Sequence, residues 1–344
     1  MTLTADQILA IPKDQPEKLF SQTDFHAEYK RFMKIWHPDR NGDPSADKVS
    51  ARIGQLFVSA EKKNFENNWV LDGELIFTAS SKKYKFKYLK MHTTDVGKMY
   101  IGHKNVAFVF DKLNNDLFTS SHRLIDGIKF QSPKFKEEFE RFLPTSSYRK
   151  FNADIGSILF MDKTPDVVSL RDLIDFMPDK KLHPKHVAWI VSSTINVLAF
   201  LEHSNVCHNA ITTESIFVSP KYHSIVMLGG WWFSTKSSDR IVAIPNKLRT
   251  IIPKEVLVDK RSDPLYDLYG LKAMAIECLG DPSLIGSKLL MDKNIPKPLI
   301  HWLRTPPANS AKKEYTVWTN VLKESFGDRK FFKFTTDISN IYKE

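Results

Sequence analysis

Cysteine and long hydrophobic runs are scarce in this chain of 344 residues. Its two cysteines, Cys207 and Cys278, are far apart and have no metal-ligand spacing. A disulfide framework is therefore not expected. We expect the protein to reside in a reducing, cytoplasmic compartment. The most apolar stretch, residues 187–201, contains four polar residues and is too short to span a bilayer, so it predicts a buried core helix and no membrane partner. The N-terminus lacks a basic start before an apolar core, so no secretory signal is expected.

The charge is unbalanced, with 50 Lys and Arg against 40 Asp and Glu. The densest basic stretch carries Lys82, Lys83, Lys85 and Lys87. These lysines are interleaved with aromatic residues at the two-residue period of a strand, and a lysine-rich strand face discourages edge pairing. The same lysines would also suit a nucleic acid or an acidic partner, and this alternative stays open.

Two amphipathic helices are expected in the first 66 residues. Apolar residues recur at helical spacing in two sets: Phe25, Tyr29, Phe32, Met33 and Trp36, then Val49, Ile53, Leu56, Phe57 and Ala60. Residues 37–44 between them are turn-forming. Neither helix can bury its apolar face alone, so the sequence predicts an antiparallel pair around a shared core.

The tip of this pair carries His37-Pro38-Asp39, preceded by a basic helix face with Lys30, Arg31 and Lys34. Over residues 6–63 the chain resembles the J-domain family. The resemblance implies that Asp39 engages an arginine of an ATP-bound DnaK-type chaperone and helps to trigger hydrolysis. His37 and Pro38 would hold the loop, and the basic face would meet an acidic surface. The alternative is a small helical domain in which Pro38 merely ends a helix.

The remainder changes from strands to helices. Strands are expected at 74–78, 84–89, 98–101, 106–110 and 156–161, with a helix at 133–142 and mainly helices from 164 onward. This order predicts an α+β fold, in which a β-rich small lobe precedes an α-helical large lobe. The predicted domains are residues 1–66, 67–163 and 164–344.

Three segments of the larger region, in order, resemble protein kinases. They are residues 206–218, residues 252–255 (Ile-Pro-Lys-Glu) and residues 267–271 (Asp-Leu-Tyr-Gly-Leu). The resemblance implies a bilobal kinase-like fold, in which Asp267 holds the backbone of the catalytic loop and His208 packs beneath it. The alternative is an unrelated α+β domain in which these two residues are buried polar groups with satisfied hydrogen bonds.

The groups that carry out phosphoryl transfer are absent from the matching positions. Ala210 stands for the catalytic base, Ser215 for the metal-binding asparagine and Gly229 for the metal-binding acid. The phosphate-binding lysine falls at Val109, and Lys112 replaces it only if the alignment slips by three residues. Trp231 and Trp232 are large enough to fill part of a nucleotide cleft. The pattern favours a pseudokinase with no metal and no cofactor, and it leaves ATP binding doubtful.

The leading hypothesis is a co-chaperone that recruits a DnaK-type chaperone and is targeted by a catalytically inactive kinase-like domain to an unidentified client or scaffold protein. An atypical kinase or ATP-binding protein that uses displaced acids (Asp166, Asp175 or Glu214) is the enzyme alternative. A nucleic-acid-binding adaptor is the third hypothesis. The compact architecture and low cysteine content favour a bacterial or viral origin.

Overall fold

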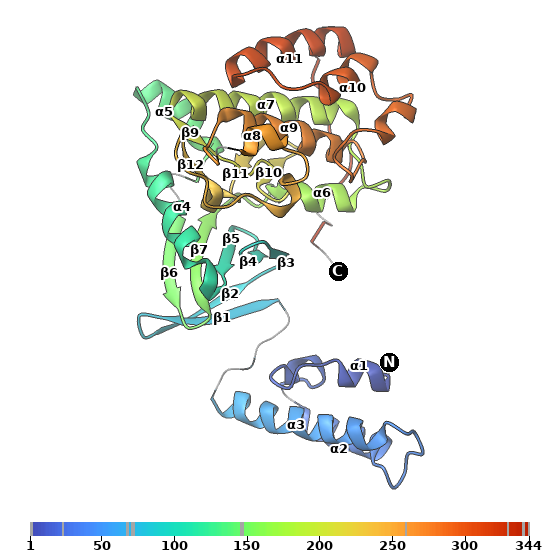
Figure 1. Cartoon of the computed structure of the whole chain (residues 1–344). Helices are drawn as coiled ribbons and strands as arrows, with labels where there is room; N and C mark the ends of the chain where they lie inside the picture. Colours follow the sequence, from blue (N-terminus) through green and yellow to red (C-terminus); the bar gives the residue numbers. More distant parts are fainter. Residues whose placement is uncertain are drawn as a thin grey trace. The chain divides into compact units, whose positions relative to one another are not determined.

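The computed structural model describes residues 3–22, 24–66, 69, 73–144, 148–258, 260–328, 330–338 and 341–342 (Figure 1). The chain forms two compact units, Met1–Tyr88 and Leu89–Glu344, which are described separately below. The predicted boundary at residue 66 stays a prediction. Among the described residues, every helix is too short or too polar to cross a membrane.

The helical part of the first unit contains α1 (Ala5–Leu9), α2 (Phe25–Trp36) and α3 (Ala46–Phe65), with a short 3-10 helix at Pro16–Lys18. Both predicted apolar stripes supply its core, which buries Phe25, Phe32, Trp36, Val49, Ile53, Leu56 and Ala60. Tyr29, in the second turn of α2, stacks on Phe57, in the second half of α3, with 4.1 Å between ring centroids. The two helices therefore pack against each other.

A β-hairpin ends the first unit. Strands β1 (Glu74–Ala79) and β2 (Lys82–Lys87) are antiparallel and joined by two serines, Ser80 and Ser81, that both have positive φ (48° and 61°). Two consecutive positive φ values are typical of the tight turns that match strand twist. The four lysines of β2 are exposed, and Lys85 forms an ion pair of 2.6 Å with the buried Glu74.

The second unit begins with an antiparallel sheet in the order β6-β7-β5-β4-β3. Its strands are β3 (Lys90–Thr94), β4 (Gly97–Ile101), β5 (Asn105–Phe110), β6 (Tyr148–Ala153) and β7 (Gly156–Asp162). Two helices, α4 (Asn115–Gly127) and α5 (Pro133–Phe139), separate β5 from β6. The sequence did not predict β3, β6 or α4, and the helix expected over 133–142 ends as a 3-10 turn at Glu140–Phe142.

Helices dominate the remainder (Figure 1). Its helices are α6 (Leu170–Phe176), α7 (Pro184–His203), α8 (Lys254–Leu257), α9 (Pro264–Cys278), α10 (Lys297–Arg304) and α11 (Ala311–Phe326). Short strands lie between them: β8 (Val168–Ser169), β9 (Val206–Cys207), β10 (Ile216–Ser219), β11 (Ser224–Met227) and β12 (Thr235–Lys236). The apolar stretch 187–201 lies within α7 and is mostly buried, as predicted for a core helix.

Candidate functional site

The loop after α2 presents an acidic side chain to solvent. Helix α2 ends at Trp36 because Pro38 disfavours helical geometry at His37, which is extended (φ −65°, ψ 129°). The backbone N–H of Asp39 donates to Nδ1 of His37 (3.3 Å), and the N–H groups of Arg40 and Asn41 donate to the His37 carbonyl. The Asp39 side chain is 85% exposed. Its carboxylate lies 3.6 Å from Nδ1 of His37, so the loop is an ordered turn that leaves the carboxylate accessible to a partner.

The predicted basic face lies on the exposed side of α2. Lys30, Arg31 and Lys34 are all exposed, whereas Phe32 and Trp36 are buried in the helical core. The same helix thus stabilises the first unit with one face and offers three cations with the other. The structure brings these cations and Asp39 into one helix-and-loop element.

In the second unit, Asp267 holds the loop that resembles a catalytic loop. Its two carboxylate oxygens accept hydrogen bonds from the backbone N–H groups of His208 (2.8 Å) and Asn209 (2.7 Å). Asp267 lies in the first turn of α9, behind the N-cap Asp263. Because both donors are buried, the carboxylate replaces the water that these N–H groups would otherwise bind. This is the contact that the kinase resemblance predicts.

His208 fixes a second segment against this loop. Its ring Nε2 lies 3.1 Å from the carbonyl oxygen of Gly229, and burial lowers its pKa to about 3, so the ring is neutral. Gly230 follows with φ +82°, and a Cβ there would lie 2.6 Å from the His208 ring. Only glycine fits such a position without strain. Gly230 is therefore required by packing around His208.

Packing is tight at the positions where the kinase resemblance would place metal ligands. A Cβ at Gly229 would lie 3.0 Å from both the Glu214 carbonyl oxygen and Cα of Ser215, so a carboxylate side chain cannot enter without displacing backbone. The Ser215 hydroxyl already bonds to the backbone N–H and carbonyl of Thr212, at 3.0 Å each. Across the described part of the chain, no three His, Cys, Asp or Glu residues are placed to bind a metal ion together.

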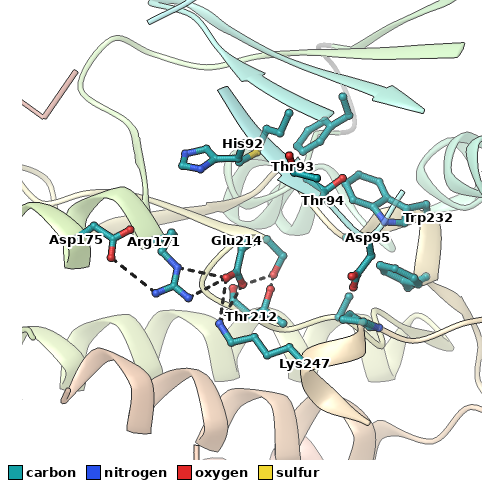
Figure 2. A pocket seen from close by; sticks show the side chains of 17 residues that line it. His92, Thr93, Thr94, Asp95, Arg171, Asp175, Thr212, Glu214, Trp232 and Lys247 are labelled. Carbon is teal, nitrogen blue, oxygen red and sulfur yellow. Dashed lines mark hydrogen bonds and ion pairs between the residues drawn. The ribbon is translucent and has the colours of Figure 1, made fainter. Parts of the chain in front are cut away.

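A pocket of about 540 Å³ opens beside this loop (Figure 2). Its lining comes from β3–β5 (His92, Thr93, Thr94, Asp95, Met99, Phe108), from α6 (Arg171, Asp175), from the loop (Ala210, Thr212, Glu214, Ser215) and from residues beyond it (Gly230, Trp232, Phe233, Pro245, Lys247). Ala210 and Ser215, two of the predicted degenerate positions, are therefore pocket residues, and Gly229 adjoins the lining residue Gly230.

Lys112 does not line the pocket. It is exposed and lies in the 3-10 helix Lys112–Asn114 after β5. Of the displaced acids, Asp175 and Glu214 line the pocket, whereas Asp166 accepts a hydrogen bond from Ser219 outside it (2.5 Å). The side chain of Glu255, the last residue of the kinase-like segment 252–255, lies outside the described residues.

An ion-pair network forms one wall of the pocket. Nζ of Lys247 lies 3.0 Å from Oε1 of Glu214 and 2.6 Å from Oε2 of the buried Glu277. Arg171 binds the same two carboxylates, at 3.1 and 2.6 Å, and lies 3.9 Å from Asp175. Burial works to raise the pKa of Glu214, but Lys247 and Arg171 outweigh it and lower that pKa to about 2. Both cations are thus already held by carboxylates.

Sequence reasoning missed Arg171, Lys247 and Asp95 as pocket residues. Arg171 and Lys247 are separated by 76 positions, and neither belongs to a motif (247 − 171 = 76). Asp95, in the turn between β3 and β4, accepts hydrogen bonds from the backbone and side chain of Asn246, at 2.9 and 2.8 Å. Only the folding of distant segments brings these residues together, so no local signal could have revealed them.

The two tryptophans take different positions. Trp231 is fully buried and donates its indole N–H to the carbonyl of Met227 (2.7 Å). Trp232 lines the pocket and packs on Phe108 and Phe110, with ring centroids 4.9 and 5.3 Å away. One tryptophan therefore packs in the core, and the other forms part of the pocket wall.

No family model and no curated protein matches this chain. Among solved structures, that of vaccinia related kinase 3 is similar at 16% sequence identity with a TM-score of 0.47, and the match covers 74% of this chain and 93% of that chain. The second unit itself consists of a sheet followed by helices, with Asp267 bound to the His208 loop.

Proposed function

We propose that the chain is a co-chaperone: its first unit recruits a DnaK-type chaperone and stimulates its ATPase, and its kinase-like unit binds a client or scaffold protein without transferring phosphate. The observation that carries the proposal is the exposed Asp39 in the ordered loop between two packed helices. The basic residues Lys30, Arg31 and Lys34 on the solvent face of α2 support it, because they would meet an acidic surface.

The test is the steady-state ATPase rate of a purified DnaK-type chaperone with and without the full chain. We expect the wild type to raise the rate and Asp39→Asn to abolish the increase. Asp47→Asn, an equally conservative change of an exposed acid in the first turn of α3, is the matched control and should leave the stimulation intact. Absence of stimulation by the wild type contradicts the proposal.

The second part of the proposal, that the kinase-like unit transfers no phosphate, is supported by the residues at the three predicted catalytic positions. The catalytic-base position, Ala210, carries a methyl group, and the metal-ligand positions are occupied by the internally bonded Ser215 and the tightly packed Gly229. Phosphoryl transfer needs a base or water-orienting group and oxygen ligands for magnesium. This chain supplies neither at those positions.

An atypical ATP-binding protein is the second candidate, because two of its displaced acids, Asp175 and Glu214, line the pocket. The discriminating measurement is a thermal melt with ATP and magnesium, since a bound ligand raises the melting temperature by mass action. A magnesium-dependent rise would favour this candidate. An unchanged melting temperature would favour the non-catalytic role, as we expect from the pairing of Glu214 with Lys247.

A further inference from the structure

Residues 330–338, called the strap below, follow α11 and lie against the second unit. Exposed and half-buried residues alternate along 331–338, as in an extended chain with one covered face. Phe334 and Ile338, on the covered face, pack against the large hydrophobic core. The strap therefore covers apolar surface, although its backbone is irregular over residues 330–337.

Three histidines lie beneath the aromatic residues of the strap. They are His183 and His186, at the beginning of α7, and His223, in the turn between β10 and β11. Phe332 contacts the first two, with ring centroids 4.6 and 4.9 Å away, and Phe334 contacts His186 at 4.8 Å. Phe331 stacks on His223 at 4.3 Å. Ring contacts with histidines therefore hold the strap in place.

The hydrogen bonds of these rings suit the neutral form. Nδ1 of His186 accepts from the indole N–H of Trp189 (3.3 Å), and Nδ1 of His183 accepts from the backbone N–H of Lys185 (3.2 Å). A protonated imidazole carries hydrogen on both nitrogens, so protonation breaks both bonds. Nε2 of His223 is buried without a hydrogen-bond partner among the described residues, so the charged ring would carry an unpaired buried donor there.

The charged side chains on the surrounding elements do not favour protonation either. Most are cations: Lys185 on α7, Lys221 in the turn between β10 and β11, and Lys330 and Lys333 on the strap. Lys185 lies over the Phe332 ring, with its Nζ 5.2 Å from the centroid. The acid of the strap, Asp337, is exposed and forms no ion pair with the three histidines. A positive charge on these rings would therefore meet other positive charges.

The pKa values follow from this environment. Burial, together with the nearby rings of His223 and His183, lowers the pKa of His186 to about 4. Burial also lowers the pKa of His183, and Lys185 acts in the same direction. The pKa of His223 is lowered by burial, although a hydrogen bond to the backbone of Phe332 opposes the shift. The three rings are thus neutral at pH 7 while the strap covers them.

We propose that the strap is a pH-controlled switch, docked on the second unit while the three histidines are neutral and released when they are protonated. Release hydrates the charged rings and uncovers the apolar surface on which Phe334 and Ile338 pack. The released histidines regain an ordinary pKa near 6.5, so the released state binds more protons. Docking is therefore complete above pH 6.5 and weakens as the pH falls. This inference goes beyond the co-chaperone function and does not depend on it.

The test is limited proteolysis of the full chain with thermolysin, which cleaves beside large apolar residues. The rate of the first cut within the strap is divided by the rate for a free peptide of the same sequence, which corrects for the pH dependence of the protease. We expect this ratio to rise at least about tenfold from pH 7.5 to pH 5.5, the change that His186 alone supplies. A constant ratio, or cuts within α11 that rise in parallel because the whole unit unfolds, overturns the proposal.

Variants assign the effect to the histidines. His186→Gln keeps an acceptor for Trp189 but cannot be protonated, so the rise should be about tenfold smaller. His301→Gln, the same change at an exposed position of α10, is the matched control and should keep the full rise. Phe332→Ala should speed the first cut at pH 7.5, because it removes contacts with two histidines. If His186→Gln is unfolded by near-ultraviolet circular dichroism, His223→Gln takes its place. An undiminished rise in the folded variant contradicts the proposal.

Discussion

At the scale of single residues, Asp267 stabilises a buried loop of the second unit. It satisfies two buried backbone N–H groups of a loop that lies 58 and 59 positions away in sequence. Burial raises the pKa of Asp267 to about 7, although the two hydrogen bonds act in the opposite direction. Removing such an acceptor leaves buried donors unpaired, which is more costly than losing a hydrogen bond at the surface.

Asp267→Ala should therefore lower the free energy of unfolding by about 3 kcal/mol, which is the cost of two unpaired buried N–H groups. The measurement is urea denaturation of the full chain. Asp263→Ala on the same helix is the matched control, because its side chain only caps Leu265 N–H at an exposed helix end and should cost about 1 kcal/mol. Equal losses for the two variants would argue against the role given to Asp267.

His208 makes stability depend on pH. Its folded-state pKa of about 3 lies below the ordinary value of 6.5, because burial disfavours the charged ring. The unfolded chain therefore binds more protons, and the free energy of unfolding falls as the pH drops below 6.5 and is fully retained above it. We expect His208 to account for a loss of about 2 to 3 kcal/mol between pH 6.5 and 4.5.

The check is a series of urea titrations across that pH range for the wild type and His208→Gln. The variant should be less stable at pH 7.5, but its stability should decline less steeply as the pH falls. Parallel pH profiles would mean that other groups, such as His186 with a pKa lowered by burial to about 4, cause the acid sensitivity.

At the scale of elements, the helical part of the first unit is stabilised by the packing of α2 against α3. Arg52 of α3 also donates to the carbonyl groups of Leu9 and Ile11, at 3.1 and 2.5 Å, which ties the end of α1 to the pair. An ordered loop at His37-Pro38-Asp39 requires this interface, because its two ends are the ends of α2 and α3. Damage to the interface should therefore reach the loop.

Leu56→Ala should destabilise the helical part by about 2 to 5 kcal/mol, because it leaves a cavity at a fully buried position. Val58→Ala, two residues along the same helix at a position 65% exposed, should change stability by less than about 0.5 kcal/mol. Hydrogen exchange of the α2 and α3 amides measures both. Similar protection in the two variants would contradict the packing described for α3.

At the scale of the whole molecule, the chaperone-recruiting loop and the pocket lie in different units. The proposed activities are therefore separable by mutation. Asp39 is exposed, and no other residue packs its carboxylate into the core. A charge-neutralising change there should affect function without affecting the rest of the chain.

Asp39→Asn should keep the melting temperature of the wild type, with a change in stability below about 0.5 kcal/mol. In the same protein the stimulation of the chaperone ATPase should be lost. The paired measurements are a thermal melt and the chaperone ATPase assay. A large fall in melting temperature would show that Asp39 stabilises the fold.

The hypothesis that the chain is a nucleic-acid-binding adaptor can be tested at the lysines of β2. If an oligonucleotide binds there, its affinity should fall steeply with salt and disappear when Lys83, Lys85 and Lys87 become Glu. We expect no such salt-dependent binding in filter-binding or anisotropy measurements, because Lys85 already pairs with Glu74. Strong binding that the triple variant abolishes would favour the adaptor hypothesis.

The spacing of apolar residues along the sequence was sufficient to predict many of the helices and strands. The stripes of α2 and α3, the core helix α7 and the strands β1, β4, β5 and β7 follow from apolar periodicity, which reports burial directly. The periodicity missed β3 and β6 because neither strand has a fully buried residue, and most of their residues are polar. It missed α4 because that helix begins with polar residues and buries only a narrow side, at Phe118, Ser121 and Ile125.

From the sequence alone, the kinase resemblance predicts that Ala210, Ser215 and Gly229 stand where reacting groups would be, and this assignment stays a prediction. Only the tertiary structure decided what stands in their place: Lys247 and Arg171 bound to Glu214 and Glu277, Asp95 held by Asn246, and an unpaired indole N–H in Trp232. The physical reason is that charge pairing and burial depend on distance in space, and these residues are dozens of positions apart in sequence.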